Sequence, residues 1–95
     1  MYVLLRKDLD PIYASVQAGH AVAEFCLKNS NHHKWNNDFL IYLAVKNEDK
    51  LSSWAYKLKS NKISYEMFKE PDIGYQKTAL ATVCSGEVFK KLKLF

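Results

Sequence analysis

Residues 11–28 are predicted to form a helix with a narrow polar seam that carries an imidazole and an amide. At roughly 100° per residue, the seam comprises Tyr13, Gln17, His20, Glu24 and Lys28. A histidine exchanges a proton near neutral pH, and a glutamine amide both donates and accepts hydrogen bonds. The seam is therefore a candidate working surface. An ordinary solvated helix face also needs polar residues, and that interpretation stays open.

The signals at the start of this helix are clear. Asp10 is a favourable N-cap residue, and Pro11 suits the first helical position because it has no N–H to leave unpaired. The arc opposite the seam is apolar or small and is expected to face the core. Its members are Ile12, Val16, Gly19, Val22, Ala23, Phe25 and Cys26.

The rest of the chain alternates between strand-type and helix-type patterns. The predicted elements are strands at 2–6, 39–45, 63–68 and 78–84, and helices at 11–28, 48–59 and, briefly, after Ser85. This β-α-β-α-β-β-α order predicts an α/β fold, with a four-stranded mixed sheet and helices packed on it, in one domain spanning 1–95. Two helical crossovers imply parallel strands, and the short last connection implies an antiparallel pair.

Two further features of this fold are expected. The unbroken apolar run at 39–45 favours a central strand that is covered on both faces. In the second helix, Leu51, Trp54, Ala55 and Leu58 follow helical spacing, which places Trp54 in the core. Ligands of such sheets collect beyond the carboxyl ends of parallel strands. The segments 6–10 and 70–77 both follow strands in this way and are expected to line one crevice.

Composition limits the function classes. The 95 residues are 48% hydrophobic and carry a formal charge of +4 with a pI near 9.1, which suits an anionic partner without the dense basic clusters of many nucleic-acid-binding proteins. No secretory or membrane-spanning pattern is visible, so a cytoplasmic protein is expected. Cys26 and Cys84 are expected to be reduced and buried. The pair His32 and His33 lacks metal-type spacing, so no metal or cofactor is indicated.

Four short motifs resemble those of the type II peptidyl-tRNA hydrolases, in particular their shortened, phage-type relatives. Leu-Arg-Lys-Asp-Leu at 5–9 is similar to the family's Val-Arg-x-Asp-Leu, and Gln-Ala-Gly-His-Ala at 17–21 to its Gln-Cys-Ser-His-Ala. Asp72 with Gly74 is similar to its Asp-x-Gly loop, and Thr-Ala-Leu-Ala at 78–81 to its last strand. The resemblance covers nearly the whole chain, including the order of elements.

The resemblance implies hydrolysis of the ester that joins a peptide to the 3′ end of tRNA. In the implied mechanism, Asp72 orients or deprotonates water, while His20 acts as an acid or base or holds the substrate. Gln17 and Thr78 position the ester, and Arg6 holds a phosphate. The implied pocket comprises Arg6, Asp8, Gln17, His20, Asp72 and Thr78. The family's active-site lysine, in the loop before the first helix, has no counterpart here, which leaves open whether the chain is an enzyme.

Two alternatives keep the pocket and change the ligand. In one, a phage-type protein cleaves or sequesters a cyclic nucleotide signal, with Arg6, Lys7 or Lys77 near the phosphates. In the other, Tyr75, Lys77 and the Arg6 region bind RNA or a nucleotide without catalysis. Ordinary structural roles also fit the site residues: Asp72 as a turn carboxylate, Thr78 as a strand residue and Arg6 as a surface charge. A homodimer, in which a second copy of the chain covers a sheet edge, is a further expectation.

Overall fold

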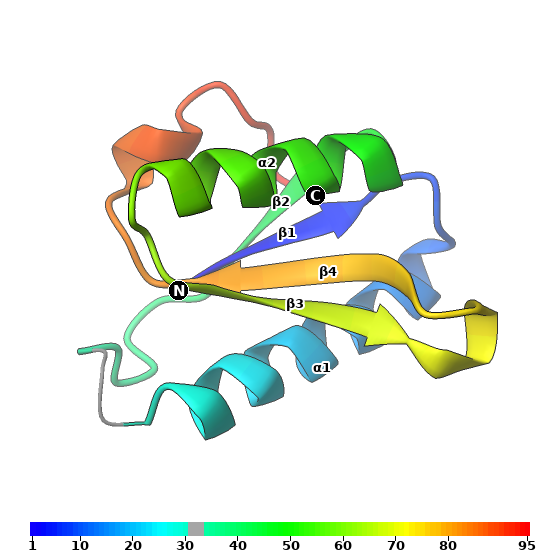
Figure 1. The fold of residues 1–95 in the computed structure, drawn as a ribbon, viewed down its shortest axis with the longest axis horizontal. Coiled ribbons are helices and arrows are strands. Elements are labelled where there is room, and N and C mark those ends of the chain that lie inside the picture. Colours follow the sequence, from blue (N-terminus) through cyan, green and yellow to red (C-terminus); the bar gives the residue numbers. More distant parts are fainter. Residues whose placement is uncertain (31–33) are drawn as a thin grey trace.

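A four-stranded mixed sheet lies at the centre of the structure, a computed structural model that describes residues 1–30 and 34–95 (Figure 1). The spatial order of the strands is β2-β1-β4-β3. The strands β1 and β2 are parallel to each other, and β4 is antiparallel to both of its neighbours, β1 and β3. The strands are β1 (Tyr2–Arg6), β2 (Ile41–Val45), β3 (Tyr65–Glu70) and β4 (Gln76–Thr82). The predicted α/β class, mixed sheet and order of elements are confirmed.

The two long helices cover opposite faces of this sheet (Figure 1). They are α1 (Pro11–Lys28) and α2 (Glu48–Ser60), and two short 3-10 segments follow, η1 (Pro71–Ile73) and η2 (Gly86–Phe89). The predicted caps are present, because the Asp10 carboxylate accepts from the first turn of α1 and the Asn47 side chain accepts from the Lys50 N–H. The helix predicted after Ser85 is only the 3-10 turn η2.

Alternation along the strands divides the apolar residues into two cores. Val3 and Leu5 of β1 pack with Phe25 on the α1 side, whereas Leu4 packs with Leu51 and the rest of the α2 side. Each helix thus has its own core. A surface on α1 and a surface on α2 are therefore separated by the whole thickness of the sheet.

The orientation of α1 differs from the prediction. Ile12 and Val16, expected in the core, are 78% and 53% exposed, and Gly19 and Ala23 are exposed as well. Of the expected core arc, Phe25 is buried, and Val22 and Cys26 are partly buried. The buried face is made mainly of small residues, which let the helix axis approach the sheet closely. It comprises Ala14, Gln17, Ala18, Ala21 and Phe25.

The strand predicted to be central, β2, is an edge strand whose outer side is paired with the end of the chain. Leu43 forms an isolated antiparallel bridge with Leu94, and the Phe95 N–H donates to the Tyr42 carbonyl at 2.9 Å. Both faces of β2 still contact the two cores, which explains its unbroken apolar sequence. The strand β3 is the other edge, so the predicted second copy stays a prediction for that edge.

Five strand boundaries differ from the prediction by two residues: β2 begins at Ile41, β3 begins at Tyr65, β4 ends at Thr82, and two further differences lie near the site. The third strand runs to Glu70 instead of ending at residue 68, and the fourth begins at Gln76 instead of Thr78. Glu70 is therefore the last, buried residue of a strand rather than a loop residue. Trp54, expected in the core, is only half-buried, whereas Leu51, Ala55 and Leu58 are buried as predicted.

Candidate functional site

A chain of buried hydrogen bonds joins α1 to both β3 and β4. The Thr78 hydroxyl donates to Gln17 Oε1 at 2.7 Å, and Gln17 Nε2 donates to Glu70 Oε1 at 3.1 Å. Thr78 and Gln17 are fully buried, and Glu70 is 8% exposed. Since buried amides and hydroxyls are costly without partners, this chain fixes the position of the Glu70 carboxylate relative to α1.

A β-bulge brings Thr78 into this chain. Phe68 pairs with Ala79 and Lys69 pairs with Lys77, so Thr78 has no counterpart on β3. An extra residue of this kind redirects the neighbouring side chains. As a result, Thr78 and Ala79 both contact the α1 side, whereas the Lys77 side chain reaches α2.

The Glu70 carboxylate is held in its ionised form. The hydrogen bond from Gln17 lowers the pKa of Glu70, and the bond from the Asp72 N–H at 3.3 Å and the electrostatic influence of His20 act in the same direction. Burial opposes them without reversing the direction of the shift. The site therefore presents a fixed negative charge beside an imidazole. Glu70 was not among the residues predicted from sequence, because its strand was predicted to end two residues earlier.

His20 is exposed at the surface and lies flat on a ring of β3. Its imidazole stacks on Phe68 with a centroid distance of 4.3 Å and an interplanar angle of 7°. This contact, together with its effect on the pKa of Glu70, places His20 beside the carboxyl end of β3. The predicted residues His20, Gln17 and Thr78 thus lie at one corner of the molecule.

Tyr13 supplies an unused hydrogen-bonding group at the same corner. Its phenolic oxygen is buried and has no hydrogen-bond partner among the described residues. Burial raises the pKa of Tyr13, and the charges of Glu70 and Asp72 raise it further, so both carboxylates lie within electrostatic range of this hydroxyl. An unpartnered buried hydroxyl is rare and calls for an explanation. We define the corner site as Tyr13, His20, Glu70 and Asp72.

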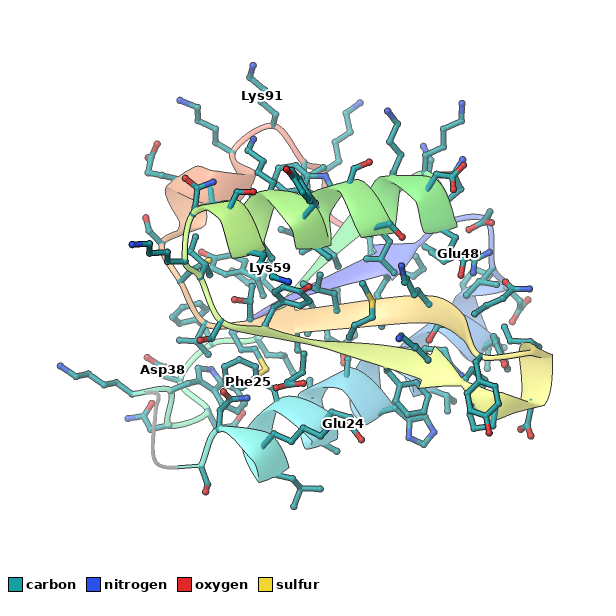
Figure 2. The ribbon with its side chains drawn as sticks, in the orientation of Figure 1. Glu24, Phe25, Asp38, Glu48, Lys59 and Lys91 are labelled. Carbon is teal, nitrogen blue, oxygen red and sulfur yellow. The ribbon has the colours of Figure 1, made fainter. Side chains whose placement is uncertain are left out.

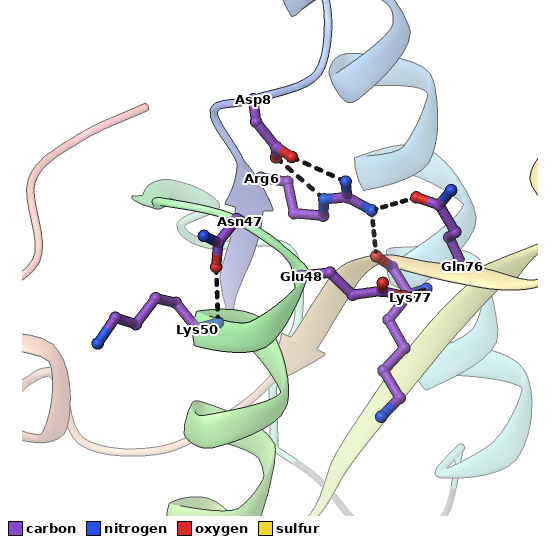
Figure 3. A network of polar contacts seen from close by, with 7 residues as sticks. All are labelled: Arg6, Asp8, Asn47, Glu48, Lys50, Gln76 and Lys77. Carbon is purple, nitrogen blue, oxygen red and sulfur yellow. Dashed lines mark hydrogen bonds and ion pairs between the residues drawn. The ribbon is translucent and has the colours of Figure 1, made fainter.

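The predicted phosphate ligand Arg6 has several hydrogen-bond partners within the chain (Figure 3). Its guanidinium forms a two-pronged ion pair with Asp8 at 2.8 and 3.0 Å, and a third nitrogen donates to the Gln76 side chain and the Lys77 carbonyl. Four of its five N–H donors are thus used, and the residue is only 6% exposed. These bonds bring the segments 6–10 and 70–77 together, as the topology predicted.

The other two predicted ligand residues lie apart from the corner site. Lys77 Nζ contacts the Ser52 hydroxyl at 3.0 Å, and the backbone N–H of Lys77 donates to the Glu48 carboxylate. Lys77 therefore belongs to the α2 side of the sheet. Tyr75 is 67% exposed and, with Gly74, adopts the left-handed conformation in the turn before β4. Tyr75 is thus displayed to solvent at the tip of the hairpin.

The corner site combines a fixed carboxylate, an exposed imidazole and a free phenol, a set that suits acid–base chemistry. In the part of the chain that the structure describes, no three His, Cys, Asp or Glu side chains are grouped to hold a metal ion. His32 and His33 lie outside the described residues. Cys26 and Cys84 are free thiols as predicted, but both are only partly buried.

Comparisons with known proteins leave the family open. No model of a known protein family matches the chain, and none of the curated proteins matches it. Over residues 1–30 and 34–95, the structure contains no helix that is both long and apolar enough to cross a bilayer.

Replacing Asp8 by Asn tests the Arg6 ion pair. The hydrogen bonds from Arg6 lower the pKa of Asp8 from its ordinary value of 3.8, so the pair stabilises the fold fully above that pH and less as the pH falls through the lowered value. Because Asp8 is partly exposed, we expect Asp8→Asn to cost below about 1 kcal/mol at pH 7. Urea unfolding at pH 7 and pH 2.5 should show the difference from wild type shrinking at the lower pH. A difference that grows on acidification would contradict this.

Replacing Thr78 by Val tests the buried hydrogen bonds that link Thr78, Gln17 and Glu70. The substitution keeps the side-chain volume and removes the hydroxyl, which leaves Gln17 Oε1 without its donor and should cost roughly 1–3 kcal/mol. Thr82→Val is the matched control, because Thr82 is equally buried and loses a comparable bond to the Ser64 carbonyl at the far end of β4. Both variants should show lower urea midpoints with unchanged slopes. A Thr78→Val protein as stable as wild type would show that the hydrogen bond from Thr78 to Gln17 contributes nothing to the stability of the fold.

Proposed function

We propose that this protein is a hydrolase that cleaves the ester at the 3′ end of a peptidyl-tRNA, with the corner site as its reacting surface. The observation that supports this most is that His20, the histidine of the family-like motif, stacks on Phe68, two residues before the ionised and rigidly held Glu70 and within electrostatic range of it. A histidine base needs a stabilised imidazolium, and an adjacent carboxylate provides it. The resemblance of the motifs to type II peptidyl-tRNA hydrolases supports the choice of substrate.

In the proposed reaction, His20 takes a proton from water as the water oxygen attacks the ester carbonyl carbon. The bond between that carbon and the 3′ oxygen of the tRNA then breaks, and the proton on His20 passes to the leaving oxygen. Glu70 stabilises the protonated imidazole and is a positioning residue. Asp72, exposed on η1, orients the water. We assign the developing oxyanion to the hydroxyl of Tyr13, which is buried in the free protein, so the corner site has to open around this oxygen when the substrate binds.

Gln17 and Thr78 have indirect roles in this proposal. Both are fully buried, so they hold Glu70 instead of touching the ester. Arg6 and Asp8 brace the carboxyl end of β1 against β4. Contacts to tRNA phosphates then fall to exposed lysines of this basic chain, and such contacts make binding dependent on salt.

The stacked pair of His20 and Phe68 favours a second candidate function at the same corner. Nucleobases stack readily on imidazole and phenyl rings, so this pair suits binding or cleavage of a nucleotide signal. Incubation with cyclic di- and oligonucleotides separates the possibilities. Linear products would indicate a phosphodiesterase, and intact ligand recovered after heat denaturation would indicate sequestration.

Substitution of the three ionisable groups His20, Glu70 and Asp72 tests the hydrolase. His20→Ala should lower kcat for peptidyl-tRNA roughly 10²–10⁴-fold, the usual contribution of a general base. Glu70→Gln and Asp72→Asn should lower kcat by smaller factors and leave KM nearly unchanged. Glu24→Gln, on the same helix but paired with Lys28, is the control and should keep the wild-type rate. Thr78→Val should lose more activity than the equally destabilised Thr82→Val. Equal rates for His20→Ala and wild type, or intact peptidyl-tRNA with wild type, would refute the proposal.

Tyr13→Phe separates catalysis from stability. The change removes only an oxygen that has no partner, so the unfolding midpoint should stay the same or rise. If the hydroxyl stabilises the oxyanion, kcat should fall roughly 10²-fold, the effect of losing one such donor. Stopped-assay kinetics and urea unfolding on the same preparation measure both. A less stable variant with full activity would mean that the hydroxyl has a structural partner in solution instead.

A further inference from the structure

A cavity lies on the α2 side, away from the corner site. It has a volume of about 590 Å³ and lies between the end of α2 and the segment that follows η2. One part of its lining is apolar, with Trp54, Ile63 and Val88. A pocket of this size, lined by an aromatic ring and a few polar groups, is typical of small-ligand sites.

The other part of the lining is cationic. Lys57, Lys90 and Lys91 contribute three positive charges against the single carboxylate of Glu87. Among the ion pairs of the described chain, none involves these three lysines, although Glu87 lines the same cavity. Figure 2 shows Lys91 on the C-terminal segment next to α2, pointing away from the sheet. The cavity therefore offers unpaired ammonium groups to an anion.

The indole of Trp54 is positioned between the core and these cations. The buried Phe89 packs against it at a centroid distance of 5.4 Å, so the ring is held by the α2 core. Lys57 Nζ lies 4.7 Å from the ring centroid, which places a positive charge directly beside an aromatic face. This combination of a fixed aromatic ring and exposed cations suits a ligand that has both a planar apolar part and a phosphate.

We propose that this cavity is a nucleotide site in which the three lysines hold phosphate and the base packs against Trp54 and the apolar wall. The proposal does not depend on the hydrolase function, because the corner site lies across the sheet on α1. A smaller cavity of about 240 Å³ shares Trp54 and Lys57 and extends along α2 to Lys50. The bound group is therefore either a free nucleotide or one nucleotide of an RNA strand that continues along α2.

Tryptophan fluorescence tests the site directly. The chain has two tryptophans, so a Trp35→Phe protein reports on Trp54 alone. It is titrated with ATP, a single-stranded hexanucleotide RNA and inorganic phosphate. We expect saturable quenching by ATP or RNA, because stacking alters indole emission, and much weaker binding of phosphate alone. Saturation by ATP only identifies a free nucleotide, and tighter binding of RNA identifies a strand.

Charge-matched variants supply the control. Replacing Lys57, Lys90 and Lys91 by Gln should weaken binding at least tenfold, because one hydrogen bond to a charged group is worth about that factor. The control replaces three exposed lysines outside the cavity, Lys7, Lys34 and Lys46, and should change affinity less than about threefold. Absence of saturable quenching, equal losses in both triple variants, or phosphate binding as tightly as ATP would each overturn the proposal.

Discussion

The amide of Gln17 is the interaction on which the α1 half of the molecule depends. It lies fully buried in a layer otherwise made of alanines and phenylalanine, where an unpaired amide would cost roughly 1–3 kcal/mol. In the observed rotation of α1, the amide accepts from Thr78 and donates to Glu70 together. The same rotation turns Ile12 and Val16 outward and sets His20 on Phe68. A polar contact, more than apolar area, therefore selects how this helix lies.

The bulge at Thr78 extends this constraint to the sheet. Without the extra residue, strict alternation would send the Thr78 side chain toward α2, the side on which Lys77 now contacts Ser52. The bulge places the adjacent residues Thr78 and Ala79 on the same face of β4 and leaves Lys77 on the opposite face. On the α1 face, the Thr78 hydroxyl binds Gln17, which in turn holds Glu70. On the α2 face, the backbone N–H of Lys77 donates to Glu48 at the start of α2. Arg6, which binds the Lys77 carbonyl, then joins this part of β4 to the end of β1.

The order of elements followed from local signals, whereas the site followed only in part, since His20 and Asp72 were predicted and Glu70 was not. Capping at Asp10 and Asn47, strand-type runs and turn residues depend on neighbours in sequence, so they predicted the fold class correctly. The rotation of α1 could not be predicted because apolar residues occur around most of that helix, and counting large side chains favoured Ile12 and Val16 over alanines. Glu70 was missed for a related reason. Its burial depends on Gln17, which is 53 residues away, and no short pattern encodes that contact.

The polar groups of this protein divide by whether the fold already satisfies them. Arg6, Gln17 and Thr78 have partners within the chain, so a ligand would have to break those bonds to use them. The Tyr13 hydroxyl has no hydrogen-bond partner within residues 1–30 and 34–95, and leaving it buried lowers stability unless a ligand supplies the missing bond. Exposed lysines such as Lys57 are cheap to leave unpaired because water solvates them. The unpaired phenol is therefore the stronger indication of a functional site. The cationic cavity indicates a ligand site only because a fixed indole lies beside its lysines.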